Sequence, residues 1–396
     1  NSIREYEALQ TYEDLLVRAV QRQMLSDVPI AILLSGGVDS ALITKIAQDI
    51  SGECLDTYTA GYAIESAANE FVEARGSAAI LNTRHHEVIL DEKVFFDTLP
   101  SLVKAIEEPL GSQSIFPINF LSSQIHQDGY KVALTGQGVD EPWAGYGRYN
   151  SEIYFDKFQS PLLTVFRPLY RLFSHDKVKR GIRALTSGNR VNRFVETYSV
   201  FNANMIERMA SGLSNVSYRN SLSNLIQHKF EYLSLEEYRG VDAMTFLDAR
   251  MNLSDDLLLY TDKISMQHSV ELRVPFLDLD LMKFAESLPS KLKVTLFKNK
   301  VLHKKLSEKF LPKEIVHRKK KGFYTPRREW FKGELGDKYL SLLMEDTGSF
   351  SNLINRKYLC SLFIRHKQGA VNYEKQIYLL VVLFYWMRYF VDGKDI

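Results

Sequence analysis

Cysteine is scarce in this sequence of 396 residues. Only Cys54 and Cys360 are present, and they lie far apart in the chain. Two cysteines at such a separation form neither a zinc-ligand pattern nor a disulfide framework. The composition therefore argues against a disulfide-stabilised secreted protein and predicts a reducing, cytoplasmic location.

Long apolar runs and an excess of one charge are also lacking. The longest apolar run, residues 377–387, has about half the length of a membrane-spanning helix, so we interpret it as a core helix. The first residues are polar and acidic, without the apolar region of a signal peptide. Fifty Lys and Arg oppose 48 Asp and Glu, which leaves a net charge of +2. We expect neither a membrane nor a nucleic acid among the partners.

The most informative segment that is present runs from residue 32 to residue 40 and reads ILLSGGVDS. An apolar run ends at a glycine-rich turn, and apolar residues then recur at helical spacing up to Ile50, which predicts a strand, a loop and a helix. Loop N–H groups and the start of a helix favour an anion. Asp39 would repel a phosphate unless a cation lies between them, which implies Mg²⁺. The alternative is an ordinary glycine-rich turn without a ligand. The segment is not a Walker A motif, because the lysine of that motif is missing.

Strands and helices alternate along the first part of the chain. Residues 9–24 form an amphipathic pattern with Tyr12, Leu16 and Val20 on one face, and Gly52 is placed to end the helix after the glycine-rich loop. Strands are expected at 30–34, 55–60, 86–90 and 132–134, and helices near 40–50, 69–81, 92–106 and 115–127. This alternation predicts an α/β fold with a doubly wound, mostly parallel sheet.

Ligands of such sheets bind at the carboxyl ends of the strands, where the loops 35–40, 61–66 and 135–141 are expected. We predict a nucleotide-binding α/β core over residues 26–150, a mostly helical insertion over 151–250, and a helical part over 251–396 that completes the active site. Within this last part, loops are expected at 262–280 and 317–330.

A second strand end runs into a glycine-rich loop with acids, LTGQGVDE at residues 134–141. Two such loops can hold one cation between Asp39 and Asp140, with phosphate oxygens and water completing the Mg²⁺ shell. The alternative is that Asp140 caps a following helix.

Six segments occur in a specific order between residues 26 and 330: SDVPIAILLSGGVDSALI, LNTRHHEV, EEP, TGQGVDE with AGYGRY, DKISMQHSVELRVPFLD and RKKKGFYTPRREW. Together they resemble the synthetase domain of asparagine synthetase and its relatives, which include β-lactam synthetase and the lasso-peptide cyclases. The resemblance implies an adenine nucleotide α-hydrolase-like fold and the use of ATP and Mg²⁺. It also implies that a small-molecule or peptide carboxylate becomes an acyl-adenylate, that pyrophosphate leaves, and that ammonia or another amine displaces AMP.

The resemblance also implies roles for the residues at the matching positions. Lys320 would stabilise the negative charge of the adenylation and amide-forming steps, as a fixed ammonium group does in a dry site. Asp39 and Asp140 would bind the metal. The nucleotide would lie against Leu34, Ser35, Gly36, Gly37, Val38, Asp39, Ser40, Ala60, Thr135 and Gly136.

Two other pairs carry less specific signals. Glu271 and Arg273 form an acid–base pair beside a proline turn and match a site-supporting segment, with a structural ion pair as the alternative to catalysis. His85 and His86 fall on opposite faces of a strand, so they cannot chelate one ion together and a structural role is expected.

The chain departs from asparagine synthetases at Gln137, where those enzymes usually carry a glutamate that can accept a proton from the nucleophile. Glutamine cannot act as a base. β-Lactam synthetase has tyrosine at the matching place, so this catalytic position varies with the nucleophile. Glu141 and Tyr146 lie nearby in sequence, without an assigned replacement role.

Asparagine synthetases also carry an upstream glutaminase domain with an N-terminal cysteine, for which roughly two hundred further residues would be needed. This chain begins with Asn1. Three explanations stay open: a removed domain, a separate glutaminase subunit, or an amine other than glutamine-derived ammonia. The leading hypothesis is an ammonia-using amidotransferase. The alternatives are a ligase for another amine and a non-catalytic nucleotide-binding protein.

Overall fold

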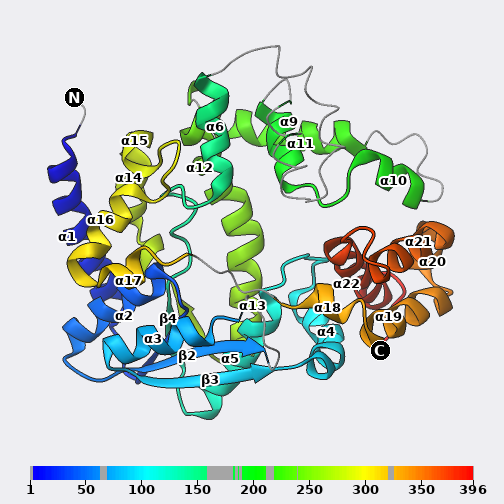
Figure 1. Cartoon of the computed structure of the whole chain (residues 1–396), viewed down its shortest axis with the longest axis horizontal. Coiled ribbons are helices and arrows are strands. Elements are labelled where there is room, and N and C mark those ends of the chain that lie inside the picture. The colour runs from blue at the N-terminus through cyan, green and yellow to red at the C-terminus, as the bar shows by residue number, and fades with distance from the viewer. Residues whose placement is uncertain are drawn as a thin grey trace. The chain divides into compact units, whose positions relative to one another are not determined.

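A five-stranded parallel sheet is the framework of the computed structural model, which describes residues 3–62, 69–157, 182, 186, 190–210, 218–238, 240–319 and 325–395 (Figure 1). The strand order is β3-β2-β1-β4-β5. The strands are β1 (Ile30–Leu33), β2 (Asp56–Tyr62), β3 (Arg84–Leu90), β4 (Val132–Thr135) and β5 (Glu271–Arg273). All neighbouring pairs are parallel, which confirms the predicted doubly wound fold. The order reverses between β1 and β4, where such sheets bind ligands.

Helices cover both faces of this sheet (Figure 1). On one face, α2 (Val38–Ser51) and α3 (Phe71–Leu81) pack against the strands, and α1 (Glu5–Gln23), α16 (Val301–Phe310) and α17 (Lys313–Val316) pack on α2. On the other face lie α5 (Ile115–Gln127) and α13 (Leu259–Gln267). The predicted apolar face of α1 is confirmed, because Tyr12, Leu16 and Val20 are fully buried. Gly52 ends α2 with φ 68°, as predicted.

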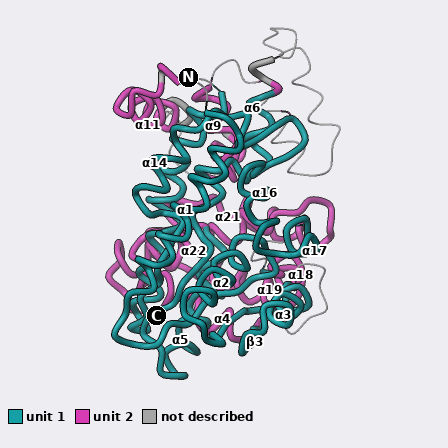
Figure 2. Tube along the Cα trace, turned by 90° about the vertical axis from the view of Figure 1, so that its left-hand side faces the viewer, with its two compact units in different colours: residues 1–91, 112–153, 240–325 teal, residues 92–111, 154–239, 326–396 magenta. Residues whose placement is uncertain are grey.

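The chain divides into two compact units, coloured separately in Figure 2. Unit 1 comprises residues 1–91, 112–153 and 240–325, and unit 2 comprises residues 92–111, 154–239 and 326–396. The segments predicted from the sequence, 26–150, 151–250 and 251–396, stay a prediction. Besides the elements named above, unit 1 contains α12 (Gly240–Asp248), the π-helix η3 (Ala249–Leu258), η4 (Pro275–Leu277), α14 (Leu279–Ser287) and α15 (Ser290–Lys293). The helix α6 (Gly147–Lys157) begins in unit 1.

The described part of unit 2 is helical. It contains α4 (Glu92–Ile106), α9 (Arg190–Tyr198), α10 (Ala203–Met209), α11 (Tyr218–Tyr232), η2 (Leu235–Glu237), α18 (Arg327–Trp330), α19 (Glu334–Glu345), α20 (Ser349–Leu353), α21 (Arg356–Lys367) and α22 (Glu374–Phe390). The long apolar run lies in α22, where Ile377, Val381 and Phe384 are fully buried, so its prediction as a core helix is confirmed. Among the described residues, no helix has the length and apolar character to cross a membrane.

The predicted loop at 262–280 is wrong. Its first residues continue α13, and residues 271–273 form β5, the edge strand that pairs with β4. A three-residue strand is too short to produce a recognisable alternation, so its formation depends on pairing with a neighbour distant in sequence. The predicted loop at 317–330 contains the short helix α18, while residues 320–324 lie outside the described part.

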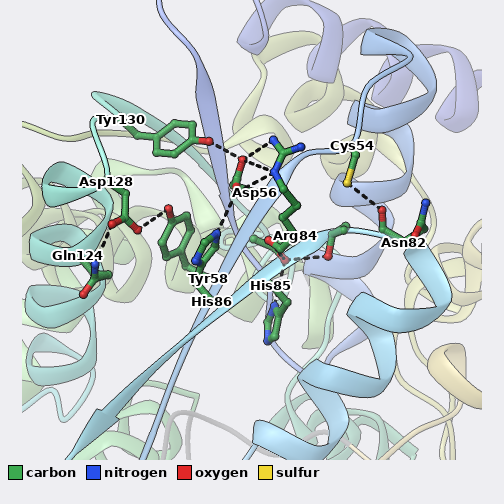
Figure 3. Close-up of polar contacts among 12 residues, drawn as sticks. Cys54, Asp56, Tyr58, Asn82, Arg84, His85, His86, Gln124, Asp128 and Tyr130 are labelled. Atoms are coloured by element: carbon green, nitrogen blue, oxygen red, sulfur yellow. Dashed lines mark hydrogen bonds and ion pairs between the residues drawn. The ribbon is translucent and has the colours of Figure 1, made fainter.

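A polar network fastens the amino ends of β2 and β3 (Figure 3). The Asp56 carboxylate accepts hydrogen bonds from Arg84 Nη2 at 2.6 Å, His86 Nε2 at 2.8 Å and the Tyr130 hydroxyl at 2.5 Å. The His85 Nδ1 atom instead lies 2.9 Å from the Thr57 hydroxyl. The two histidines thus have different partners, as expected for side chains on opposite faces of a strand. Cys54 and Cys360 are free thiols.

Candidate active site

The glycine-rich loop after β1 is held by its own serine hydroxyls. Ser40 Oγ accepts a hydrogen bond from the Ser35 backbone N–H at 3.0 Å and lies 2.9 Å from Ser35 Oγ. Gly37 is the N-cap of α2 and provides no side-chain cap. The first-turn N–H groups of α2 therefore carry partial positive charge and have no side-chain acceptor from the N-cap, as an anion site requires.

The loop after β4 crosses directly over the start of α2. The strands β1 and β4 are neighbours, with Leu33 paired to Thr135. A Cβ atom on Gly136 would lie 2.6 Å from the Ser40 backbone nitrogen, a contact that side chains do not tolerate. Glycine at this position is what lets the two loops approach, and it brings Asp39 and Asp140 to one place.

The two aspartates converge on a single ammonium group. Lys300 Nζ lies 2.7 Å from Asp39 Oδ2 and 2.7 Å from Asp140 Oδ1. Both acids are 8% exposed and Lys300 is 4% exposed. A Cβ atom on Gly145 would lie 1.9 Å from Asp140 Oδ1 and 2.5 Å from Lys300 Cε, so this glycine makes room for the pair. Lys300 has φ 54°, a backbone conformation that is sparsely populated except by glycine.

The Lys300 ammonium occupies the position between the two carboxylates, and the oxygen atoms around it are of the kind that a divalent cation prefers. Two carboxylates within hydrogen-bond distance of one nitrogen place oxygen donors around a single position, and oxygen is the ligand that Mg²⁺ prefers. Among the described residues, no group of three or more His, Cys, Asp and Glu side chains could hold a metal. The protein therefore offers two carboxylates here, and the remaining ligands would be phosphate oxygens and water.

Asp39 has a second neighbour that the sequence did not indicate. His303 Nε2 lies 3.0 Å from Asp39 Oδ1, and His303 Nδ1 lies 2.7 Å from the Tyr12 hydroxyl. Burial lowers the pKa of the His303 imidazole, and the hydrogen bond to Asp39 offsets only part of this effect. Burial and the Asp39 charge raise the pKa of Tyr12 well above its usual range. Burial thus disfavours the charged form of both side chains.

These loops open into a pocket of about 300 Å³ within unit 1. Its wall includes these predicted nucleotide-site residues: Leu34, Ser35, Gly37, Asp39, Ser40, Thr135 and Gly136. Gly36, Val38 and Ala60 were predicted too, but they do not line it. Further lining residues, which the sequence did not indicate, are Tyr58 on β2, Ile118 on α5, and Leu257 and Tyr260 at the junction of η3 and α13.

The pocket also contains two hydrogen-bond acceptors without a partner. Gln137 Oε1 and Glu141 Oε2 are buried and make no hydrogen bond in the described structure. The other oxygen of Glu141 accepts a hydrogen bond from the Tyr146 hydroxyl at 2.7 Å. Burial raises the pKa of Glu141, and the Asp140 charge raises it further. Buried acceptors of this kind require a donor, so the pocket is suited to an N–H-bearing ligand.

Lys320 lies outside the described residues, but its described neighbours contact the site. Arg318 Nη1 donates hydrogen bonds to the Gly36 carbonyl at 3.0 Å. On the other side, the Thr325 hydroxyl lies 2.8 Å from the hydroxyl of Tyr62, at the carboxyl end of β2. The predicted role of Lys320 stays a prediction.

Glu271 and Arg273 do not lie with the other predicted site residues. Neither lines the pocket, and Glu271 pairs with Val132 at the amino end of β4. Arg273 Nη1 donates to the carbonyls of Gln23 and Leu25 at 2.7 and 2.8 Å. These contacts connect the end of α1 to the sheet. They support a structural role for Glu271 and Arg273 rather than a catalytic one.

Comparison with known proteins agrees with the resemblance that the motifs predict. Asparagine synthetase (glutamine-hydrolyzing) 1 of Bacillus subtilis strain 168 is 26% identical over 392 residues, which cover 96% of this chain and 60% of the relative. A putative asparagine synthetase (glutamine-hydrolyzing) of Mycobacterium bovis is 26% identical over 96% of this chain and 57% of its own length. Amidase chyE of Penicillium rubens is 24% identical over 86% of this chain and 56% of its own length.

The chain spans about 60% or less of the length of these relatives. The family model for asparagine synthase matches residues 11–388, a range that contains both glycine-rich loops, Lys300 and His303. This chain belongs to the asparagine synthase family.

Proposed function

We propose that this chain is an ATP-dependent ligase that activates a carboxylate as an acyl-adenylate, releases pyrophosphate and then forms an amide with ammonia. One observation carries the proposal: Asp39 and Asp140 converge within 2.8 Å of one cationic nitrogen, beside the uncapped start of α2, in a buried pocket. Two carboxylates beside an anion-binding helix start would repel a polyphosphate unless a cation lies between them. The arrangement therefore supports joint binding of a cation and a polyphosphate.

In this proposal the residues of the first loop bind the leaving pyrophosphate. The backbone N–H groups of Val38, Asp39 and Ser40 point along the axis of α2 toward the pocket, as helix N-termini do toward phosphates. Asp39 and Asp140 would hold Mg²⁺, which neutralises phosphate charge when bound. The Lys300 ammonium contacts both carboxylates, so its side chain would shift when Mg²⁺ takes this position, and Lys320 is proposed to stabilise the charge that builds on the α-phosphate.

The nucleophile is proposed to reach the acyl-adenylate from the side of Gln137 and Glu141. Their two unpaired oxygens can accept hydrogen bonds from an incoming N–H group. Ammonia fits this arrangement, and a glutaminase domain or subunit would supply it. The first two relatives carry the words glutamine-hydrolyzing in their names, and this chain covers 60% or less of each.

A specific observation favours one second candidate, a ligase for an amine other than ammonia. Gln137 stands where asparagine synthetases usually carry glutamate, and its amide can bind a nucleophile without deprotonating it. The two candidates differ in substrate. The first forms product with ammonium chloride, whereas the second is inert to ammonium and requires a substrate that bears its own amine.

The test is isotopic. The protein is incubated with ATP, MgCl₂, ammonium chloride and a panel of ¹⁸O-labelled carboxylic acids that begins with aspartate. The proposal expects one ¹⁸O atom in AMP for each product formed, because the carboxylate oxygen remains on the α-phosphorus. Product without label in AMP rejects the adenylate route. The Asp39→Ala protein should be about 100-fold slower or more, whereas Asp49→Ala, on the exposed side of α2, should keep its rate.

A further inference from the structure

We propose that Tyr12 and His303 are positioning residues that fix the carboxylate of Asp39 for cation binding. The inference rests on the proposed function, because it concerns the same cation site. It assigns a role to the N-terminal helix α1, which contributes Tyr12 although none of its residues lines the pocket.

Three helices that are distant in sequence supply the three members of this chain of hydrogen bonds. Tyr12 lies on α1, His303 on α16 and Asp39 on α2. The hydrogen bonds measure 2.7 Å from Tyr12 to His303 and 3.0 Å from His303 to Asp39. Tyr12 and His303 are fully buried, so no water molecule can replace either partner.

The chemistry of the partners determines the direction of both hydrogen bonds. A carboxylate only accepts, so His303 must present N–H at Nε2 toward Asp39. A neutral imidazole then has its lone pair on Nδ1, and the Tyr12 hydroxyl must donate to it. Asp39 thereby sets the tautomer, and the Tyr12 hydroxyl supplies the donor that the Nδ1 lone pair needs. Without the hydroxyl, Nδ1 would be a buried acceptor with no donor, and the imidazole ring would lose one of its two anchoring hydrogen bonds.

This chain of bonds limits the rotation of the Asp39 carboxylate. His303 Nε2 lies 3.0 Å from Oδ1, and Lys300 Nζ lies 2.8 Å from Oδ1 and 2.7 Å from Oδ2. With His303 bound to Oδ1, the carboxylate plane is fixed and both oxygens stay directed toward the position shared with Asp140. Hydrogen-bonded partners behind metal ligands typically contribute about 10- to 100-fold to metal affinity.

Stacking holds Tyr12 itself in place. Its ring lies 3.9 Å from the ring of Trp143, nearly parallel to it, and Phe284 packs at 6.5 Å from Tyr12. Trp143 belongs to the loop that carries Asp140. A Tyr12→Phe substitution keeps these ring contacts and removes only the hydroxyl, so it separates the hydrogen bond from the packing.

The experiment measures Mn²⁺ binding, because Mn²⁺ replaces Mg²⁺ and its free form is quantified by electron paramagnetic resonance. The protein is titrated with Mn²⁺ in the presence of saturating α,β-methylene-ATP, which cannot release pyrophosphate. The variants are Tyr12→Phe, His303→Leu and His303→Gln, with Phe284→Leu as the packing control and Asp39→Asn as the ligand control. Thermal unfolding is followed for every variant.

We expect Tyr12→Phe and His303→Leu to weaken Mn²⁺ binding by about 10-fold or more. His303→Gln retains an N–H donor and should recover part of this loss. Phe284→Leu should lower the unfolding temperature and leave Mn²⁺ affinity within about 2-fold, because it removes apolar contacts only. Unchanged affinity in both Tyr12→Phe and His303→Leu, with Asp39→Asn defective, overturns the positioning role alone. Unchanged affinity in Asp39→Asn overturns the cation site and the proposed function with it.

Discussion

The ammonium nitrogen of Lys300 lies 2.7 Å from Asp39, on the α2 helix that follows the glycine-rich loop. The two residues are 261 positions apart in the sequence. Since the same nitrogen also contacts Asp140, one positive charge serves two buried carboxylates. Buried charges are costly unless they are paired, so Lys300 is part of what allows the two acids to lie together.

Removal of this charge should destabilise the chain. In Lys300→Met the stem length is kept and the ammonium is lost, which leaves two buried acids facing each other. The free energy of unfolding in EDTA should fall by about 3–5 kcal/mol, as measured by urea denaturation. Lys305→Met is the control: it breaks a pair with Glu5 whose side chains are 47% and 49% exposed, and the expected loss is below about 1 kcal/mol. Equal effects of the two substitutions would contradict a buried role for Lys300.

Position 137 offers a direct test of the nucleophile. Gln137→Glu adds a carboxylate to the pocket lining, which also includes Glu141, and a carboxylate can accept a proton where the amide cannot. The assay uses the carboxylic acid substrate identified with the ¹⁸O-labelled panel and measures AMP formed at saturating ATP. The ammonium-dependent rate of Gln137→Glu should exceed that of the unsubstituted protein by about 10-fold or more.

The control for this substitution is Gln137→Met, which has a similar length and neither donates nor accepts a strong hydrogen bond. We expect it to lower the rate with ammonium and to leave pyrophosphate release in the absence of a nucleophile unchanged. A lower ammonium-dependent rate in Gln137→Glu would instead favour recognition of a different amine through the amide.

The sheet and its site edge were predictable because their signals are local. In β1 and β4, apolar runs end at glycine-rich turns, and each turn carries one acid, Asp39 or Asp140. Parallel strand order then places the two turns side by side. The helices α4 and α5 also match their predicted ranges, since their apolar residues recur at helical spacing.

The remaining features of the site and the sheet depend on contacts between residues distant in sequence, which no local pattern encodes. Lys300, the N-cap of α16, and His303 within that helix lie in a lysine-rich segment that carries no recognised motif, yet both are buried against Asp39. The π-helix η3, which brings Leu257 to the pocket, has no recognised apolar period. The three residues of β5 are too few to show the alternation that predicts a strand, and β5 forms because it pairs with β4.

Gly136 should be irreplaceable at the loop crossing. In Gly136→Ala, the new Cβ would meet the backbone of Asp39 at 2.9 Å and that of Ser40 at 2.6 Å. Backbone cannot move aside as a flexible side chain does, so we expect a loss of stability of about 1–3 kcal/mol and weaker ATP binding by isothermal titration calorimetry. Gly147→Ala is the matched control, because a Cβ there meets nothing within 4 Å. If both proteins bound ATP alike, the close approach of the two loops would not matter to the nucleotide.

The network around Asp56 predicts how stability depends on pH. Burial raises the pKa of Asp56, but hydrogen bonds from Arg84, Tyr130 and His86 outweigh it and hold the pKa well below its usual range. A folded-state pKa below the unfolded value of about 3.9 stabilises the protein above that pH. This contribution is lost as the pH falls from about 4 through the folded-state pKa.

Asp56→Asn should therefore lower the free energy of unfolding by about 1–3 kcal/mol at pH 7, because it removes the charge that three donors share. The difference in free energy of unfolding between Asp56→Asn and the unsubstituted protein should shrink below pH 4. In this range Asp56 of the unsubstituted protein begins to lose its charge-dependent stabilisation. Urea denaturation between pH 7 and pH 3.5 measures it. Asp49→Asn, which breaks an exposed pair with Lys45 on α2, should cost about 0.5 kcal/mol or less at pH 7. A difference for Asp56→Asn that stays constant down to pH 3.5 would mean that its cost comes from packing rather than from the carboxylate charge.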